Sequence, residues 1–456
     1  MFGRLPGPAA QASILLSLGC AFWILAAASA VVLIPPNQTV FDLPFGFGPY
    51  VREMLTHGGY GDCRWAHCDH ASRMPLMVWV IATAGWFSHS VRLAALLKDS
   101  LIALTTLLAL SWLWLPVRGS RAVFLSWLFI GSVLVLSLPA AKHAGLIGYE
   151  ESLSLPMLFL LGAGLPLAFL GSLTRADTGR LLIAAVVVAV LLYLLKSSLM
   201  LVYGVTVVAA LAWAVLNRAK LVAAVAVLSL LAPISWGMHN LATTGRLSIM
   251  TSYDGENLFR AWNSDTLAIY PAVEIDRVFD SPRLMTQDGH LFYPSPKKRR
   301  RDFPNEWAWN DAGQAAAISW LRSHPTDTVK LLRAKVGNLL FSIGKTPRQY
   351  GPRPEPRRQT ELLEAASVTI WLVLGRLAAL LLAIALVHKV MRKADVGAVF
   401  VVAAMVAAYS APLIIGFNFE RHITTGLVMM LGCLTAMAPG ELARWLDPQR
   451  TPLPVT

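Results

Sequence analysis

The stretch LLIAAVVVAVLLYLLKSSLMLVYGVTVVAALAWAVL, residues 181–216, is apolar at almost every position except around Lys196. Each half approaches the length of roughly 20 apolar residues that a helix needs to span a bilayer. Both halves are apolar around their whole circumference, whereas a helix on a soluble core is apolar along one stripe. The stretch therefore predicts two membrane-spanning helices that meet at Lys196.

The rest of the chain is also strongly apolar. Of its 456 residues, 56% are hydrophobic and 14% are charged, against about 25% charged in a soluble domain. We therefore expect an all-α polytopic membrane protein with about ten transmembrane helices. The runs that predict them lie near 11–34, 92–116, 122–139, 153–172, 181–195, 198–216, 221–237, 366–388, 396–415 and 423–439.

Two apolar runs need a separate interpretation. The first, 11–34, is longer than the core of a signal peptide, so we expect an uncleaved anchor. The run 74–88 is too short to cross a bilayer, and we expect a re-entrant or interfacial segment.

The distribution of Lys and Arg predicts the orientation in the membrane. The net charge is +13, which we assign to cytoplasmic loops and lipid phosphates rather than to nucleic-acid binding. With a cytoplasmic N-terminus, nearly all the short basic loops fall on one side: 117–121, 174–180, 217–220 and 388–395. The external, periplasmic face of a bacterial inner membrane would then receive 35–91, 142–151, 238–365 and 416–422.

This orientation divides the chain into three expected parts. Residues 1–237 form a transmembrane module with the external loop 35–91, residues 238–365 form an external loop domain, and residues 366–456 supply C-terminal transmembrane helices and a cytoplasmic tail. Within the second part, DTVKLLRAKVGNLLFSI (327–343) predicts an amphipathic helix. The KKRRR run, 297–301, fits lipid headgroups, an acidic acceptor or a solvated face.

The external segments gather many ionisable residues. A charged group at membrane depth costs about 2.5–3.5 kcal/mol, so it commonly marks a functional site or a polar cavity. Carboxylates together with several cations suggest a general base that works beside an anionic donor. The residues are Asp42, Asp69, His70, Arg73, Glu150, Glu151, Lys196, Arg246, Arg421 and His422.

Six stretches in this order resemble one superfamily. TVFDLPFGFGPYVREMLTHGGY (39–60) with DHASRMPL (69–76) is similar to the first external loop of the protein O-mannosyltransferases. The others resemble bacterial relatives that include the lipid A aminoarabinose transferases: SRMPLMVWVIA with RLAALLKDSLIAL, GLIGYEESLSLPMLF, YLLKSSLML, PISWGMHNLATTGRLSIMTSYDGENLFRAWN and NFERHITTGLVMML. The chain thus resembles the GT-C polyprenyl-phosphate-sugar glycosyltransferases over most of 35–265 and 365–440.

The resemblance implies a reaction and roles for residues. An inverting glycosyltransferase would move one sugar from a polyprenyl-phosphate carrier to an external acceptor hydroxyl, with Asp42 as the base and Asp69 as a second catalytic carboxylate. Lys196, Arg246 and Arg421 would bind the donor phosphate. The residues expected to orient substrate are His70, Arg73, Glu151 and Asn257.

The resemblance also implies which cofactors and partners to expect. No metal is required where cations clamp a monophosphate leaving group, although a divalent metal remains possible. The expected partners are a lipid-linked sugar, a glycan, lipid or protein acceptor, and membrane lipids, without nucleic acid.

Other interpretations stay open from the sequence alone. Asp42 fits a helix-end carboxylate, and Lys196 and Arg421 fit snorkelling or anchoring residues at span ends. Cys63 and Cys68 predict a disulfide in an oxidising compartment, or less simply a zinc site with His67 and His70. The alternative functions are a lipid or polysaccharide transporter, for which Lys98 and Asp99 inside a span would be informative, and a polymerase or ligase that uses a lipid diphosphate.

The predicted orientation can be tested by cysteine labelling from outside the cell. A cysteine near Tyr60 should react with an impermeant maleimide, and a cysteine in the loop 217–220 should not. Labelling of the loop 217–220, together with no labelling near Tyr60, would show that the orientation is the opposite of the predicted one.

Overall fold

The computed structural model describes scattered positions between 17 and 34, then 36–43, 47–63, 68–114, 150–170, 173–269, 303–341, 355–393, 395–416 and 420–437. Within these ranges every regular element is a helix, and the β pairings are two isolated bridges, Thr39 with Ser90 and Asp62 with Asp69. The all-α fold is therefore confirmed. The span expected at 122–139 and the KKRRR run lie outside the described residues, as does most of 11–34.

Five described helical segments are long and apolar enough to cross a membrane, and each coincides with a predicted span. They are α7 (Arg175–Leu195), η4 with α8 (Ser197–Leu199, Met200–Leu216), α9 with α10 (Lys220–Ser229, Leu231–Thr244), α17 (Glu355–Met391) from Leu372 onward, and α18 (Val396–Ile415). Three others have shorter apolar stretches, namely α3 (Pro75–Phe87), α6 (Glu151–Ala168) and α19 (Glu420–Met437). α4 (Val91–Trp114) lies where the span 92–116 is predicted.

Local sequence explains where these helices begin and end. Pro75 occupies the first turn of α3, where a missing backbone N–H costs nothing. Thr174 caps α7 by accepting a hydrogen bond from the Asp177 backbone N–H. α10 ends at Gly245, whose φ of 73° is a left-handed conformation that glycine adopts without strain. At Lys196 the backbone is extended, with φ −156° and ψ 124°, and this separates α7 from η4 and α8.

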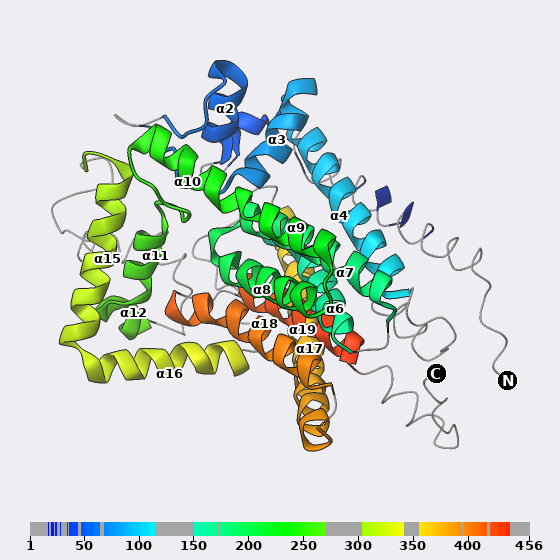
Figure 1. The fold of residues 1–456 in the computed structure, drawn as a ribbon. Coiled ribbons are helices and arrows are strands. Elements are labelled where there is room, and N and C mark those ends of the chain that lie inside the picture. The colour runs from blue at the N-terminus through cyan, green and yellow to red at the C-terminus, as the bar shows by residue number, and fades with distance from the viewer. Residues whose placement is uncertain are drawn as a thin grey trace.

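The helices α6 and α19 pack closely against each other. A Cβ at Gly162 would overlap the backbone carbonyl oxygen of Met429, and one at Gly432 would overlap that of Phe159. Small residues allow two backbones to approach in this way, as is common where helices pack in membranes. The contact fixes α19 against α6 in the middle of the bundle (Figure 1).

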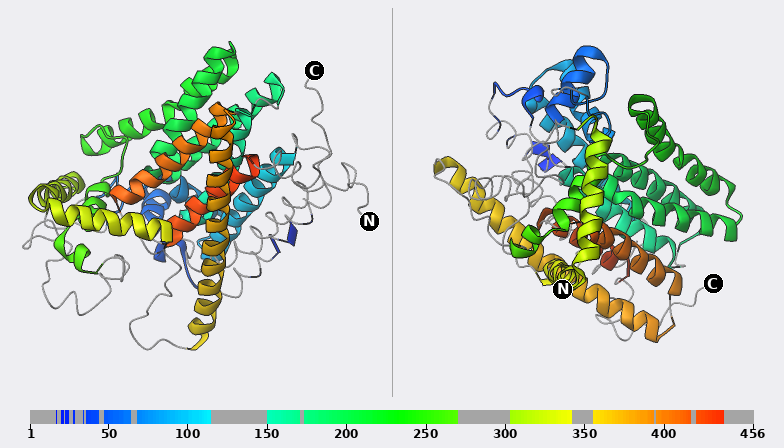
Figure 2. Two further views of the ribbon diagram at one scale, coloured as in Figure 1. Left: turned by 90° about the horizontal axis from the view of Figure 1, so that it is seen from below. Right: turned by 90° about the vertical axis from the view of Figure 1, so that its left-hand side faces the viewer.

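A second group of helices lies to one side of this bundle. It consists of α11 (Asp254–Ala261), α12 (Ser264–Ile269), α15 (Glu306–Ser323) and α16 (Pro325–Phe341). Figure 1 shows α11, α12 and α15 on the left and α16 along the bottom, and the two further views in Figure 2 keep the same grouping. α11 packs on α15 and α16 packs on α18. α16 confirms the helix predicted at 327–343.

The loop before α3 is closed on itself. Cys63 and Cys68 form a disulfide, as predicted. Asp62 and Asp69 exchange two backbone hydrogen bonds beside it, at 2.9 and 3.0 Å. Both cysteines are therefore oxidised and supply no thiolate for the zinc site considered above.

The Glu306 carboxylate joins this loop to α15. Glu306 is 1% exposed and accepts hydrogen bonds from the backbone N–H groups of His70 (2.8 Å) and Ala71 (3.0 Å). The Ser252 hydroxyl donates to the same carboxylate at 2.5 Å. One buried side chain thus connects segments that lie 236 residues apart in the chain.

We expect Glu306→Ala to lower the thermal stability of the detergent-solubilised protein strongly. It leaves three buried donors unsatisfied, each at a cost of about 1–3 kcal/mol. Asp311→Asn is the matched control, because it removes a carboxylate of α15 whose ion pair with Arg246 is exposed and worth about 0–1 kcal/mol. Equal melting temperatures for the two variants would contradict this role of Glu306.

Candidate functional site

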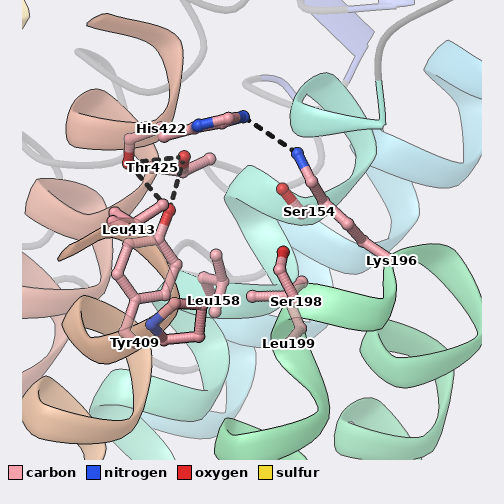
Figure 3. A pocket seen from close by; sticks show the side chains of 10 residues that line it. Ser154, Leu158, Lys196, Ser198, Leu199, Tyr409, Leu413, His422 and Thr425 are labelled. Atoms are coloured by element: carbon pink, nitrogen blue, oxygen red, sulfur yellow. Dashed lines mark hydrogen bonds between the residues drawn. The ribbon is translucent and has the colours of Figure 1, made fainter. Parts of the chain in front are cut away.

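A pocket lies where four helix ends meet, namely the start of α6, the junction of α7 with η4, the end of α18 and the start of α19 (Figure 3). We call it the Lys196 pocket. It is lined by Ser154, Leu158, Lys196, Ser198, Leu199, Tyr409, Pro412, Leu413, His422 and Thr425.

Lys196 and His422 face each other across this pocket. The Nζ atom of Lys196 lies 3.0 Å from Nε2 of His422 (Figure 3). At this distance the two groups can share a hydrogen bond, with the roles of donor and acceptor set by the tautomer of the imidazole. Lys196 therefore points across to α19 and does not simply extend from the end of its own helix.

Hydroxyl groups fix the position of His422. The Tyr409 hydroxyl donates to the His422 carbonyl oxygen at 2.7 Å and also bonds the Thr425 hydroxyl at 2.8 Å. Thr425 bonds the same carbonyl at 3.0 Å. An amine, an imidazole and several hydroxyls thus lie together beside leucine side chains.

Asp254, in α11, forms a hydrogen bond with the turn that contains Lys196 and Ser197. The Ser197 hydroxyl donates to the Asp254 carboxylate at 3.2 Å. The backbone N–H and hydroxyl of Thr251 donate to the other oxygen, at 2.9 and 3.0 Å. Burial raises the pKa of Asp254. Asp254 is not among the residues predicted from the sequence, although Thr251-x-x-Asp254 has the spacing of a helix-capping pair.

Arg73 and Glu150 form an ion pair beside the start of α6. Their charged groups are 3.7 Å apart, and the Arg73 guanidinium lies 5.2 Å from the Phe47 ring centroid and 5.4 Å from that of Tyr253. The Glu150 carbonyl accepts from the Ser154 N–H at 3.0 Å, so this pair is one helical turn from the pocket. The Glu150 side chain is 12% exposed and is paired with Arg73. The Glu151 side chain lies outside the described residues.

Asp42 ends the short helix η1 (Val40–Asp42) and is exposed. Its carboxylate accepts from the Thr39 hydroxyl at 2.6 Å and from the Thr39 backbone N–H at 3.3 Å. These two bonds, with a smaller effect of Arg52, lower the pKa of Asp42, so it is ionised at neutral pH. Asp42 is not among the described residues that line the Lys196 pocket.

The bonding of Asp42 is that of a capping pair and is not unique. Thr174 and Asp177 repeat it at the start of α7, where the two side chains bond at 2.7 Å. Asp42 therefore forms the helix-end hydrogen bonds considered above, and any catalytic role would be additional to them.

Asp69 and His70 are held mainly through their backbones. Asp69 is 2% exposed, and its carbonyl accepts from the Tyr50 hydroxyl at 2.6 Å. Nδ1 of His70 lies 2.6 Å from the Tyr60 carbonyl oxygen and therefore carries a proton that it donates. Both residues thus shape the disulfide loop, and neither lines the Lys196 pocket as described.

The remaining predicted residues lie apart from the pocket lining or are only partly described. Arg246 binds both Asp311 oxygens at 2.7 Å and stacks 4.6 Å from the Trp307 ring centroid. Asn257 is half-buried in α11. Arg421 precedes His422 at the start of α19, and its side chain lies outside the described residues. Those described residues contain no group of three His, Cys, Asp or Glu side chains that could bind a metal ion.

Two side chains that the sequence analysis did not single out hold the end of α18. Trp262 Nε1 donates to the Ile415 carbonyl at 2.5 Å, and Lys335 Nζ donates to the Gly416 carbonyl at 2.5 Å. Lys335 belongs to α16, is 0% exposed and lies 3.6 Å from the Trp262 ring centroid. Burial lowers the pKa of Lys335 to about 6. The pair fixes the helix end that leads toward His422.

Among known proteins, the matches to this chain are to solved structures. No protein-family model and no curated protein matches the chain. The solved structures that match are ArnT from Cupriavidus metallidurans bound to undecaprenyl phosphate (14% identity, TM-score 0.33) and the same protein in the apo state (15%, 0.32). Each match covers 98% of this chain and 82% of ArnT. At this similarity the match assigns no role to any residue.

We expect Lys335→Met to loosen the end of α18. Methionine keeps the length of the side chain but cannot donate to Gly416, a loss of about 0.5–1.5 kcal/mol. Amide hydrogen exchange in a peptide that spans the end of α18 and the start of α19 should rise by up to about tenfold. Lys330→Met, on the exposed face of α16, is the control and should leave that exchange unchanged. Unchanged exchange in Lys335→Met would show that this contact does not order the end of α18.

Proposed function

We propose that this protein is a membrane glycosyltransferase that transfers one sugar from a polyprenyl-phosphate carrier to a hydroxyl of an external acceptor. The observation that carries the proposal is the Lys196 pocket, where an amine and an imidazole 3.0 Å apart lie beside leucines at the ends of apolar helices. The ordered motifs that resemble GT-C enzymes support the same reaction class.

We propose that Lys196 binds the donor phosphate. The bond that breaks joins the anomeric carbon to a phosphate oxygen, so negative charge accumulates on that phosphate as the sugar leaves. A cation placed beside it stabilises the transition state more than the ground state. Arg421 is next to His422 in the chain, and its planar guanidinium suits two phosphate oxygens. We assign Arg421 to the same phosphate.

Asp42 is proposed as the general base. The acceptor oxygen attacks the anomeric carbon, its proton passes to the carboxylate, and one displacement inverts the configuration at that carbon. The low pKa of Asp42 keeps it ionised and therefore able to accept the proton. Asp69 is the alternative base, and Arg73 with Glu150 would orient substrate between Asp42 and the phosphate.

The proposal requires no cofactor, because cations of the protein neutralise a monophosphate leaving group. Its acceptor is the hydroxyl of a glycan, a lipid or a protein on the external side of a bacterial inner membrane. Undecaprenyl phosphate, the ligand in one ArnT structure, is a suitable first probe for the carrier.

The experiment follows release of undecaprenyl phosphate from a panel of undecaprenyl-phosphate-linked sugars by the full chain in vesicles. We expect Asp42→Asn to bind the carrier normally but to lose about 10²–10⁴-fold in transfer, because the amide cannot take a proton.

Two variants test whether the loss of transfer in Asp42→Asn comes from the missing base or from the altered helix cap. Asp177→Asn alters the equivalent capping pair at the start of α7, and Thr39→Val removes a hydrogen bond to Asp42 but keeps its carboxylate. Both should retain most of the transfer activity. Transfer by Asp42→Asn within a few-fold of wild type would exclude it as the base and direct attention to Asp69. No release from any donor would argue against the proposed function.

A further inference from the structure

We infer that Arg376 binds the phosphate of an anionic phospholipid from the external leaflet of the membrane. The inference concerns α17 and does not depend on the proposed function. It starts from the place of Arg376 inside the apolar segment Leu372–Met391. Two of its guanidinium nitrogens, Nε and Nη2, are buried with no hydrogen-bond acceptor among the described residues.

Arg376 lies near the end of α17 that is predicted to be external. Leu372 forms a buried cluster with Ile423 and Leu427 of α19. A Cβ at Gly375 would overlap the Leu427 side chain, so Arg376 is level with the first turns of α19. The four residues from Leu372 to Arg376 correspond to about 6 Å of helix rise. An arginine side chain at this depth can reach the phosphates of the nearer leaflet.

This position is opposite to the usual distribution of charge in membrane proteins. Lys and Arg concentrate at the cytoplasmic ends of spans. The other end of α17 and the turn that follows it carry such a group, namely His388, Lys389, Arg392 and Lys393. Anchoring at the cytoplasmic surface therefore does not explain Arg376.

The helix itself supplies no counter-charge beside Arg376. The positions one turn before and one turn after it are 372, 373, 379 and 380, and all four are apolar. Removal of a guanidinium from water is costly unless an anion or a set of acceptors compensates for it. An anion from outside the chain would complete this site.

The surface beside Arg376 indicates what that anion is attached to. Val373, Leu377, Leu380 and Ile384 are exposed and recur at i, i+4, i+7 and i+11, so they form one apolar stripe. Arg376 lies one turn from the first and third of them. Its planar guanidinium matches two oxygens of a phosphate. A phospholipid combines such a phosphate with apolar chains that would cover the stripe.

The test is thermal unfolding of the full chain in lipid-free detergent, with phosphatidylglycerol or phosphatidylcholine added back. A ligand that binds the folded state raises the melting temperature, and the concentration dependence gives the affinity. We expect phosphatidylglycerol to stabilise the wild type more than phosphatidylcholine does, because phosphatidylcholine has no net charge. Arg376→Leu should bind phosphatidylglycerol about tenfold more weakly. Without lipid it should melt no lower than the wild type, because an apolar side chain then replaces a buried cation.

Two further variants sharpen the comparison. Arg180→Leu removes an exposed arginine of α7 that pairs with Asp177, and it should respond to phosphatidylglycerol as the wild type does. Arg376→Lys keeps the charge but loses the planar fork, so it should bind phosphatidylglycerol about three- to tenfold more weakly than the wild type.

Four results would overturn the inference. The first is an equal response of the wild type and Arg376→Leu to phosphatidylglycerol. The second is an equal loss of affinity in Arg180→Leu, which would indicate general attraction to surface cations. The third is a lower melting temperature of Arg376→Leu in lipid-free detergent, because Arg376 would then be paired within the chain. The fourth is equal stabilisation by inorganic phosphate, which would exclude a phospholipid as the occupant.

Discussion

The close packing of α6 against α19 is the contact on which the site depends. Gly162 and Gly432 let the two backbones meet, since a side chain at either position would overlap a carbonyl of the partner helix. With the helices in this register, Ser154 near the start of α6 and His422 near the start of α19 line one pocket. Larger residues at these glycines would separate the helices and with them the two sides of the Lys196 pocket.

Buried polar side chains then attach the second group of helices to this bundle. Asp254 binds the turn beside Lys196, Lys335 and Trp262 bind the end of α18, and Glu306 binds the loop before α3. Each bond satisfies backbone or hydroxyl groups at a helix end or loop, where no intrahelical partner exists. The elements that carry Lys196, His422 and Arg73 are thus positioned by α11, α15 and α16.

The parts of the structure that sequence predicts well are those set by local properties. Uniform apolarity predicts the five long spans, amphipathic periodicity predicts α16, and the break at Lys196 predicts a turn. The bonds of Glu306 and Lys335 escaped prediction because they join segments 236 and 81 residues apart, and a single sequence carries no signal for such pairs. Lys98 and Asp99 are 0% and 1% exposed within α4, so the structure buries both charged residues that interrupt this predicted span.

Asp42 illustrates how a motif can serve two purposes. Thr39 and Asp42 form a capping pair whose hydrogen bonds resemble those of Thr174 with Asp177 and Thr251 with Asp254. Asp177 is in a loop predicted to be cytoplasmic, and Asp254 is buried in contact with Ser197. Of the three, Asp42 combines exposure with a position on the predicted external face, and its pKa is lowered rather than raised. The capping bonds fix the direction of the Asp42 carboxylate and keep it ionised. These are also the two properties that a base needs before an acceptor arrives, so the structural role prepares the proposed chemical role.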